Sequence, residues 1–258
     1  LTASAKGLRK KVVPWAIDYH SDVWFAGNIM DRRKSLSLRE LYLRRRFFIL
    51  AVSLLALILV TPLVEGFVGI HIVWNIFLTG ILLSGVHAVS EKNRSVYIAS
   101  LLALPMLVYL WSPYFVESNR YVLIVGSLCG VLFFAYMIVN ILIFIYRQDK
   151  VTRDLISAAV VVYLLMAIMW TFIYRLIETA HPGSFTIPTT DIHERMRFIY
   201  FSLVTISTLG YGDIVPKTSL ARSLATLEAV VGQLYLVTTV AWLVGVRVSQ
   251  SRERKYRE

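Results

Sequence analysis

Hydrophobic residues gather into six long runs along the chain, and shorter polar segments separate them. Five runs contain no Asp, Glu, Lys or Arg, and the sixth contains one carboxylate, Glu228. A helix needs about 20 apolar residues to cross a bilayer, and these runs are apolar on every side rather than along one stripe. The pattern predicts an all-α membrane protein with six transmembrane helices, at residues 47–64, 67–90, 96–112, 121–146, 155–174 and 224–246.

The segment between the fifth and sixth runs, residues 175–223, has a different pattern. It is too long for a hairpin loop and too mixed in polarity to span. Within it, residues 196–204 predict a helix that is too short to cross, followed directly by the stretch T-I-S-T-L-G-Y-G-D-I-V-P at 205–216. Non-helical backbone occurs at membrane depth only where it is buried in protein or lines a water path. We therefore expect a re-entrant helix and then a loop with a specific task.

Composition and charge agree with this picture and orient it. The chain is 57% hydrophobic and 17% charged, with a mean hydropathy of +0.64. If the N-terminus lies inside, 21 of the 27 Lys and Arg residues face the cytoplasm, as the positive-inside bias requires. We expect a multi-pass protein of the cell membrane with both termini cytoplasmic. Its net charge of +11 then indicates contact with anionic lipid headgroups rather than with nucleic acid. The residues expected to contact lipid are Arg32, Arg33, Lys34, Arg44, Arg45 and Arg46.

Gly210 and Gly212 stand two residues apart in the loop. In an extended strand alternate carbonyls point to opposite sides, and aiming them at one axis needs positive φ at every second residue, which glycine accepts most easily. Rings of such oxygens can replace the hydration shell of a cation. The C-terminal end of the preceding short helix, with its negative dipole, would favour a cation as well.

The sequence Thr208-Leu209-Gly210-Tyr211-Gly212-Asp213 resembles the selectivity filter of potassium channels, whose common form is T-V-G-Y-G-D. The similarity covers roughly residues 155–247, and the six-helix layout resembles that of bacterial potassium channels. The resemblance implies passive conduction of K⁺, bound by the carbonyls of residues 208–211 and the Thr208 hydroxyl, with no organic cofactor. It also implies that Asp213 braces the outer mouth, and that Tyr211 packs against pore-helix aromatics, namely Tyr200 and Phe201. Leu209 replaces the commoner valine, and we expect little effect because only its carbonyl faces the ion.

One filter in each chain cannot form a ring, so the resemblance also implies a homotetramer. In the sixth helix, Gly232 is either a gating hinge or a site of close helix packing. The helical face that begins at Gln233 is expected to line the cavity, and it continues through Leu236, Val240 and Val244.

Glu228 is a candidate for a filter support, since a carboxylate inside a crossing is a functional candidate. Val204 stands where other channels of this kind place a carboxylate that braces the filter, and Glu228 would take that role from behind. The alternatives are that Glu228 leans toward the outer headgroups or is protonated.

Four domains are expected: a basic leader at 1–46, a four-helix domain at 47–154, a pore domain at 155–247 and a tail at 248–258. The four-helix domain resembles a voltage sensor without gating charges, because residues 121–146 contain no Arg or Lys. Steep voltage gating is therefore not expected. The sequence contains no metal-ligand spacing, catalytic Ser/His/Asp set or phosphate loop, so an enzyme is not expected. The alternatives are a non-selective cation channel and a non-conducting sensor or scaffold.

Overall fold

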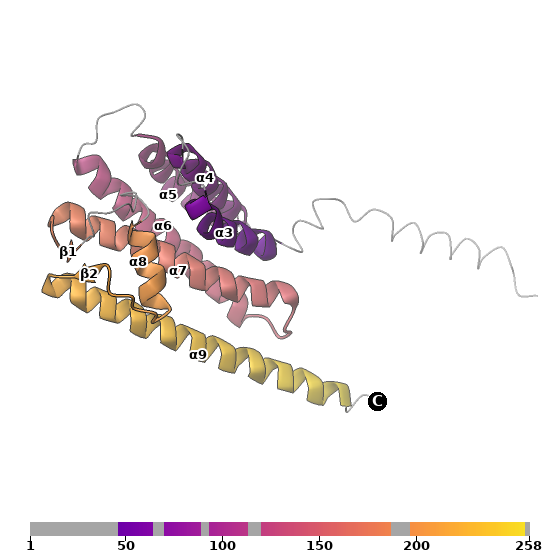
Figure 1. Ribbon diagram of the computed structural model, residues 1–258. Coiled ribbons are helices and arrows are strands. Elements are labelled where there is room, and N and C mark those ends of the chain that lie inside the picture. Colours follow the sequence, from indigo (N-terminus) through magenta and orange to yellow (C-terminus); the bar gives the residue numbers. More distant parts are fainter. Residues whose placement is uncertain (1–45, 64–69, 89–92, 113–119, 187–196, 256–258) are drawn as a thin grey trace, which may run out of the picture. The chain divides into compact units, whose positions relative to one another are not determined.

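The computed structural model describes residues 46–63, 70–88, 93–112, 120–186 and 197–255, and most of these are helical (Figure 1). Each of the six apolar runs contains a helix, and a shorter helix lies between the last two. Two short strands, β1 (Phe185–Thr186) and β2 (Val215–Pro216), pair antiparallel. The helices are α3 (Arg46–Leu63), α4 (Ile70–Ala88), α5 (Asn93–Trp111), α6 (Arg120–Tyr146), α7 (Arg153–Ala180), α8 (Arg197–Ile206) and α9 (Ser219–Lys255).

Helix α7 is the central element of this part of the chain. It begins after Thr152, whose side-chain oxygen accepts a hydrogen bond from the Leu155 backbone N–H at 3.2 Å, a standard N-cap. Along its length α7 contacts α3, α6, α8 and α9. Helix α4 packs between α3 and α5, and α5 also packs against α6. Helices α8 and α9 are thereby joined to the first four described helices through α7.

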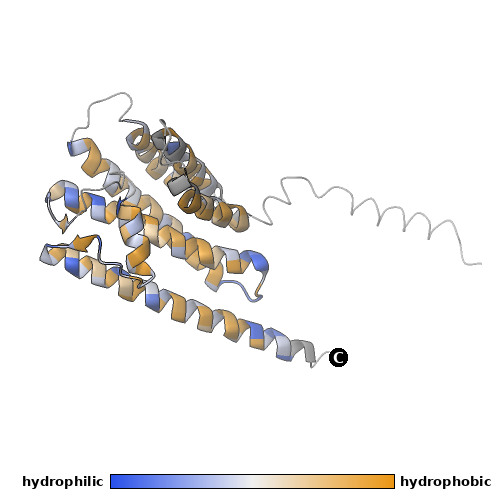
Figure 2. Ribbon diagram, in the orientation of Figure 1, coloured by the Kyte–Doolittle hydropathy of each residue, from blue (hydrophilic) through white to orange (hydrophobic). Residues whose placement is uncertain are grey.

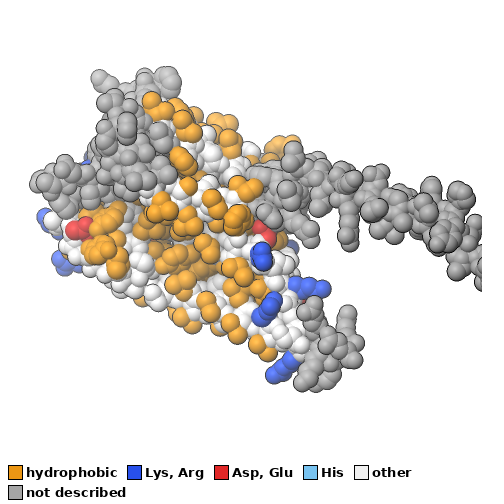
Figure 3. Space-filling model, turned by 45° about the vertical axis from the view of Figure 1, so that its right-hand side comes forward, with side chains coloured by type: hydrophobic (Ala, Val, Ile, Leu, Met, Phe, Trp, Pro, Cys, Tyr) orange, Lys and Arg blue, Asp and Glu red, His pale blue; other side chains and the backbone are white. Residues whose placement is uncertain are grey.

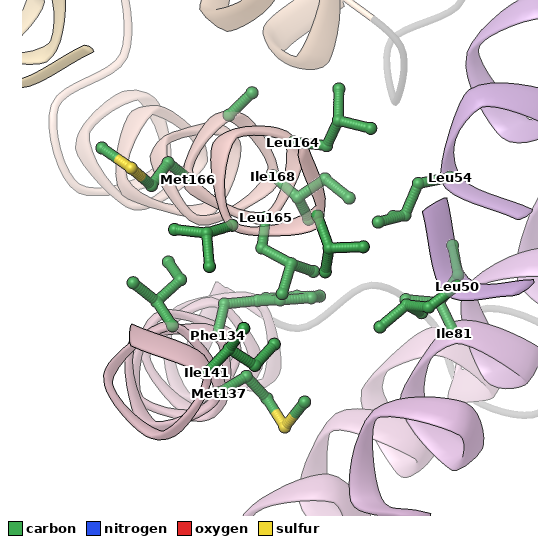
Figure 4. Close-up of a cluster of buried hydrophobic side chains, with 14 of the residues drawn as sticks. Leu50, Leu54, Ile81, Phe134, Met137, Ile141, Leu164, Leu165, Met166 and Ile168 are labelled. Carbon is green, nitrogen blue, oxygen red and sulfur yellow. The ribbon is translucent and has the colours of Figure 1, made fainter. Parts of the chain in front are cut away.

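The shared core lies between α3, α4, α5, α6 and α7, and Figure 4 shows a part of it. The residues labelled in Figure 4 are Leu, Ile, Phe and Met side chains from α3, α4, α6 and α7. Phe134 of α6 is fully buried and stacks on Phe172 of α7, with ring centroids 5.7 Å apart. The residues labelled in Figure 4 are Leu50, Leu54, Ile81, Phe134, Met137, Ile141, Leu164, Leu165, Met166 and Ile168.

Three helices of the described chain are long and apolar enough to cross a membrane: Arg120–Tyr146, Arg153–Ala180 and Ser219–Arg252. Shorter apolar segments lie in α3, α4 and α5. A count of six crossings therefore stays a prediction. Hydrophobic residues extend along all of these helices in Figure 2. On the face in Figure 3, hydrophobic side chains gather over the middle of the helices and Lys and Arg lie near their ends.

Two helices extend well beyond the C-terminal limits expected from the apolar runs. The fifth was expected to end at 174, but α7 continues through Arg175 and Glu178 to Ala180. The sixth was expected to end at 246, but α9 continues to Lys255, so most of the expected tail is helical. Both extensions are rich in Arg, Glu, Gln and Lys, which have good helix propensity, and a search for uncharged runs misses such segments.

The predicted leader at 1–46 lies outside the described residues except for its last position, where α3 begins. The expected lipid contacts at Arg32, Arg33, Lys34, Arg44 and Arg45 therefore stay predictions, as does the contact of Arg46.

Candidate ion pore

Helix α8 ends directly at the loop that contains the two glycines. Its last turn closes through the backbone N–H of Ser207, which donates to the Leu203 carbonyl at 3.1 Å. The chain then turns back, because the N–H groups of Leu209 and Gly210 both donate to the Val204 carbonyl, at 2.9 and 3.3 Å. The short helix predicted at 196–204 is thus present as Arg197–Ile206, and it fixes where the loop starts.

Backbone φ is positive at every second residue of the loop. The values are 59° at Thr208, 58° at Gly210 and 78° at Gly212. The two glycines adopt this region without a steric penalty, whereas Thr208 is the one non-glycine residue with positive φ in the described chain. Strain of this kind persists only where neighbouring structure holds it, and it is frequent at functional sites. The alternation is the geometry that brings successive carbonyls toward one side.

The carbonyl oxygens of residues 208–211 accept no hydrogen bond from any described residue. The same segment is exposed in the single subunit, with Leu209 56% and Tyr211 67% exposed. Backbone carbonyls inside a membrane protein need a partner. An exposed row of unpaired oxygens is therefore suited to binding cations.

The aromatic residues expected around the loop divide between two sides of α8. Tyr200 stacks on Tyr211, with ring centroids 6.4 Å apart and an interplanar angle of 12°. Its hydroxyl also lies near the Asp213 carboxylate, so one residue interacts with the loop at two points. Phe201, which we expected beside Tyr211, instead packs edge-on against Tyr174 at 5.0 Å. The two residues are neighbours in a helix and point in different directions.

Glu228 lies behind α8 and is fully buried. The Tyr174 hydroxyl of α7 donates to one carboxyl oxygen, and the Ser202 hydroxyl of α8 bonds to the other. Ser202 Oγ also lies 2.8 Å from the Ala167 carbonyl, although a hydroxyl has a single hydrogen to donate. Glu228 thus connects α7, α8 and α9, and it does not lean toward the outer headgroups.

The C-terminal end of the loop is held by the pair of short strands. Phe185 pairs with Pro216, and the Lys217 N–H donates to the Ser184 carbonyl at 2.8 Å. The carboxylate of Glu178, near the end of α7, accepts the Gly183 N–H at 2.8 Å and the Phe185 N–H at 3.2 Å. The segment after α7 therefore holds the exit of the loop, while α8 holds its entrance.

Gly232 lies against the last residue of α8. A Cβ at this position would be 2.5 Å from Ile206 Cγ1 and 3.0 Å from the Ile206 carbonyl oxygen. Helix α9 is continuous through Gly232. Of the two interpretations open from the sequence, this geometry supports close packing, and a hinge stays a prediction.

The helical face expected to line a cavity is exposed in the single subunit. Gln233 is exposed, as are Leu236, Val240 and Val244 at 37%, 56% and 56%. Tyr235 is buried on another face, where its hydroxyl donates to the Ala159 carbonyl of α7 at 2.7 Å. The subunit thus covers one face of α9 and leaves the predicted face uncovered.

Sequence reasoning missed Tyr174, Ser202, Tyr163 and Glu178. The Tyr163 hydroxyl donates to the Ile206 carbonyl at 3.1 Å and so satisfies a free carbonyl at the end of α8. A tyrosine or glutamate within or beside an apolar run could have indicated these contacts, because a buried polar side chain needs a hydrogen-bond partner.

A comparison with known protein families concerns this part of the chain. Residues 155–247 match a family described as "Ion channel". The potassium channel protein kcv of Paramecium bursaria Chlorella virus 1 is 31% identical over 80 residues, which is 31% of this chain and 84% of that protein. The inward rectifier potassium channel Kirbac3.1 of Paramagnetospirillum magnetotacticum is 40% identical over 65 residues, 25% of this chain and 19% of that protein.

The probable potassium channel protein 2 of Methanocaldococcus jannaschii is 46% identical over 46 residues, 17% of this chain and 13% of that protein. The chain thus spans less than a fifth of the length of the last two relatives. No solved structure gives a significant match.

Proposed function

The chain belongs to the ion channel family, and on this basis we propose that it forms a homotetrameric, potassium-selective pore in a cell membrane. K⁺ passes down its gradient, and no enzymatic step or organic cofactor takes part. Relatives named as potassium channels match the chain, and the geometry of the loop at 208–213 supports the assignment independently.

The observation that carries the proposal is the positive φ at every second residue, Thr208, Gly210 and Gly212. The carbonyls of residues 208–211 accept no hydrogen bond from the described residues. The proposed K⁺ ligands are the carbonyl oxygens of residues 208–211, together with the Thr208 hydroxyl. Four copies around one axis would surround a dehydrated ion with oxygens in place of water. Asp213, near the Tyr200 hydroxyl, braces the outer mouth.

A homotetramer is supported by what a single subunit leaves uncovered. The loop residues are exposed, and α9 presents a row of exposed apolar side chains. These side chains fit contact with neighbouring subunits or lipid. The row consists of Leu227, Val230, Leu234 and Val237.

Glu228 supports the filter from behind, through Ser202 on the pore helix and Tyr174 on α7. Gly232 allows α9 to approach α8, and a hinge at the same position remains part of the proposal. The inner cavity is lined by Gln233, Leu236, Val240 and Val244. Four copies of Leu236, Val240 and Val244 would form apolar constrictions that gate the inner mouth by dewetting.

The four-helix part at 47–154 is proposed to act as a collar around the pore rather than as a voltage sensor. Both termini are proposed to lie in the cytoplasm, with the basic leader against anionic lipids.

The test is cation flux from liposomes that contain the purified full chain. Potassium-loaded liposomes in a sodium medium should lose K⁺, and Gly210→Ala protein should abolish the preference for K⁺. Equal flux of K⁺ and Na⁺ through the wild type would favour a non-selective cation channel. No flux from tetrameric protein would favour a non-conducting scaffold.

A further inference from the structure

A small cavity lies where α4, α5, α6, α7 and α8 meet, away from the filter loop. Its volume is about 30 Å³ and it is partly open to the surface. That is space for about two water-sized groups. Most of its wall is apolar, including Leu123, Ile168 and Phe172, and one cation, Arg175 of α7, lines it.

Two groups at the cavity, the Tyr109 hydroxyl and the Arg175 guanidinium, have hydrogen-bond donors to spare. Tyr109 is 4% exposed, and its hydroxyl has no hydrogen-bond partner among the described residues. The guanidinium carbon of Arg175 lies 5.5 Å from the centroid of the Tyr109 ring, and no described carboxylate pairs with it. The other polar side chains are already engaged: Asn75 donates to the Leu110 carbonyl at 2.7 Å and Thr171 to the Ala167 carbonyl at 2.9 Å.

An arginine beside a hydrocarbon environment needs an anionic partner, because its charge is costly there. The Tyr109 ring supplies a part of this stabilisation through a cation–π contact. The planar fork of a guanidinium matches the oxygens of a phosphate in particular. The uncommitted donors, and the absence of a carboxylate among the described lining residues, therefore favour an anion as the ligand.

The position of the cavity indicates where such an anion comes from. Arg175 is five residues before Ala180, the last residue of α7, which corresponds to about 7.5 Å along the helix. That depth is near the headgroup level of a bilayer if α7 spans it. The cavity has room for small oxygen groups such as those of a phosphodiester, and its apolar wall suits the adjoining glycerol and acyl chains.

We propose that this cavity binds the phosphodiester of a membrane phospholipid, with Arg175 as the cation and the Tyr109 hydroxyl as a second donor. The site is separate from the contact proposed for the basic leader, and it does not depend on ion selectivity. Ile199 of the pore helix lines the same cavity, and Arg175 follows Tyr174, the partner of Glu228. A bound lipid would therefore contact the elements that support the filter.

The test is native mass spectrometry of the purified full chain with three probes: phosphatidylglycerol, diacylglycerol with the same acyl chains, and inorganic phosphate. We expect phosphatidylglycerol to bind and diacylglycerol to bind at least about tenfold more weakly, as expected for the loss of a charged hydrogen bond. Inorganic phosphate that bound at the same site with similar affinity would overturn the assignment to lipid. Equal binding of diacylglycerol would overturn the assignment to phosphate.

Variants test the two named residues. Arg175→Gln should weaken phosphatidylglycerol binding at least about tenfold, and Tyr109→Phe about threefold to tenfold. Tyr109→Phe removes one oxygen and leaves the ring below Arg175, so it tests the site even if Arg175→Gln fails to fold. Arg147→Gln is the matched control, because it removes an exposed charge beyond the other end of α6 and should change nothing. Wild-type affinity in Tyr109→Phe, or a loss in Arg147→Gln equal to that in Arg175→Gln, would contradict the proposal.

Discussion

Gly210 and Gly212 combine two properties, a positive φ and open space where a Cβ would be, since no atom lies within 4 Å of that position. Alanine at either position should therefore cause backbone strain rather than a clash, at about 1–2 kcal/mol in each subunit. The loop relieves this strain when the carbonyls turn away from the axis, so we expect loss of K⁺ over Na⁺ selectivity. Ion flux from liposomes measures it.

Gly183 provides the control for this substitution, because its φ is +83° and its Cβ position is equally open, but it lies outside the loop. Gly183→Ala should cause similar strain in the segment that holds the exit of the loop, and it should reduce selectivity much less than Gly210→Ala or Gly212→Ala. If all three variants keep selectivity, the assignment of the filter is wrong. If Gly183→Ala also removes selectivity, backbone strain acts through global stability instead.

The hydrogen bonds of Glu228 to Tyr174 and Ser202 predict different effects for two substitutions at position 228. The amide of a glutamine at position 228 could accept a hydrogen bond from the Tyr174 hydroxyl and donate one to the Ser202 oxygen. The Ser202 hydroxyl could then donate its own hydrogen to the Ala167 carbonyl. Glu228→Gln should therefore keep most of the tetramer's thermal stability. Glu228→Ala should lose about 1–3 kcal/mol for each buried hydroxyl left without a partner.

Thermal dissociation of the tetramer, followed on a gel, compares these variants with Tyr174→Phe. The losses of tetramer stability in Glu228→Ala and Tyr174→Phe should be less than additive in the double variant, because both substitutions remove the same Tyr174–Glu228 hydrogen bond. Fully additive losses would show that the two side chains act separately.

Helix packing determines the role of Gly232. The Cβ of Gly232→Ala would lie 2.5 Å from Ile206 Cγ1, so we expect overpacking that costs about 1–3 kcal/mol and displaces the end of α8. Ile206→Ala removes the side chain that clashes and should restore part of the K⁺ flux and tetramer stability. Gly245→Ala in the same helix, with no atom within 4 Å, is the control and should have little effect. A hinge defect without packing strain would not be rescued by Ile206→Ala.

The helices were predictable from the sequence, but their contacts were not. Apolar runs indicate helices because bilayer thickness sets their length, and the spacing of Gly210 and Gly212 indicated alternating φ. A helix that is apolar on all sides gives no periodic signal of which face meets a neighbour. For this reason the sequence could not identify Tyr174, 54 residues from Glu228, as its partner, or separate Tyr200 from Phe201.

Taken as a whole, the molecule offers little charge for a membrane potential to move. Helix α6 has no Arg or Lys between Arg120 and Tyr146, and Arg120 donates to the Ala180 carbonyl at the end of α7, at 2.7 Å. One charge moved through the field contributes about 2.3 kcal/mol per 100 mV, and steep gating needs about three or four charges in each subunit. We expect open probability to change weakly with voltage in planar bilayers with symmetrical K⁺. A steep sigmoidal conductance curve would contradict this interpretation of α6.

The central claim is that the loop at 208–213 selects K⁺ over Na⁺. It is tested most directly by the reversal potential of the purified wild-type chain in a planar bilayer, with K⁺ on one side and Na⁺ on the other. Our account predicts a current that K⁺ dominates and that reverses only at a strong voltage opposing K⁺ movement. A reversal potential near zero, with large currents carried by Na⁺, would contradict it.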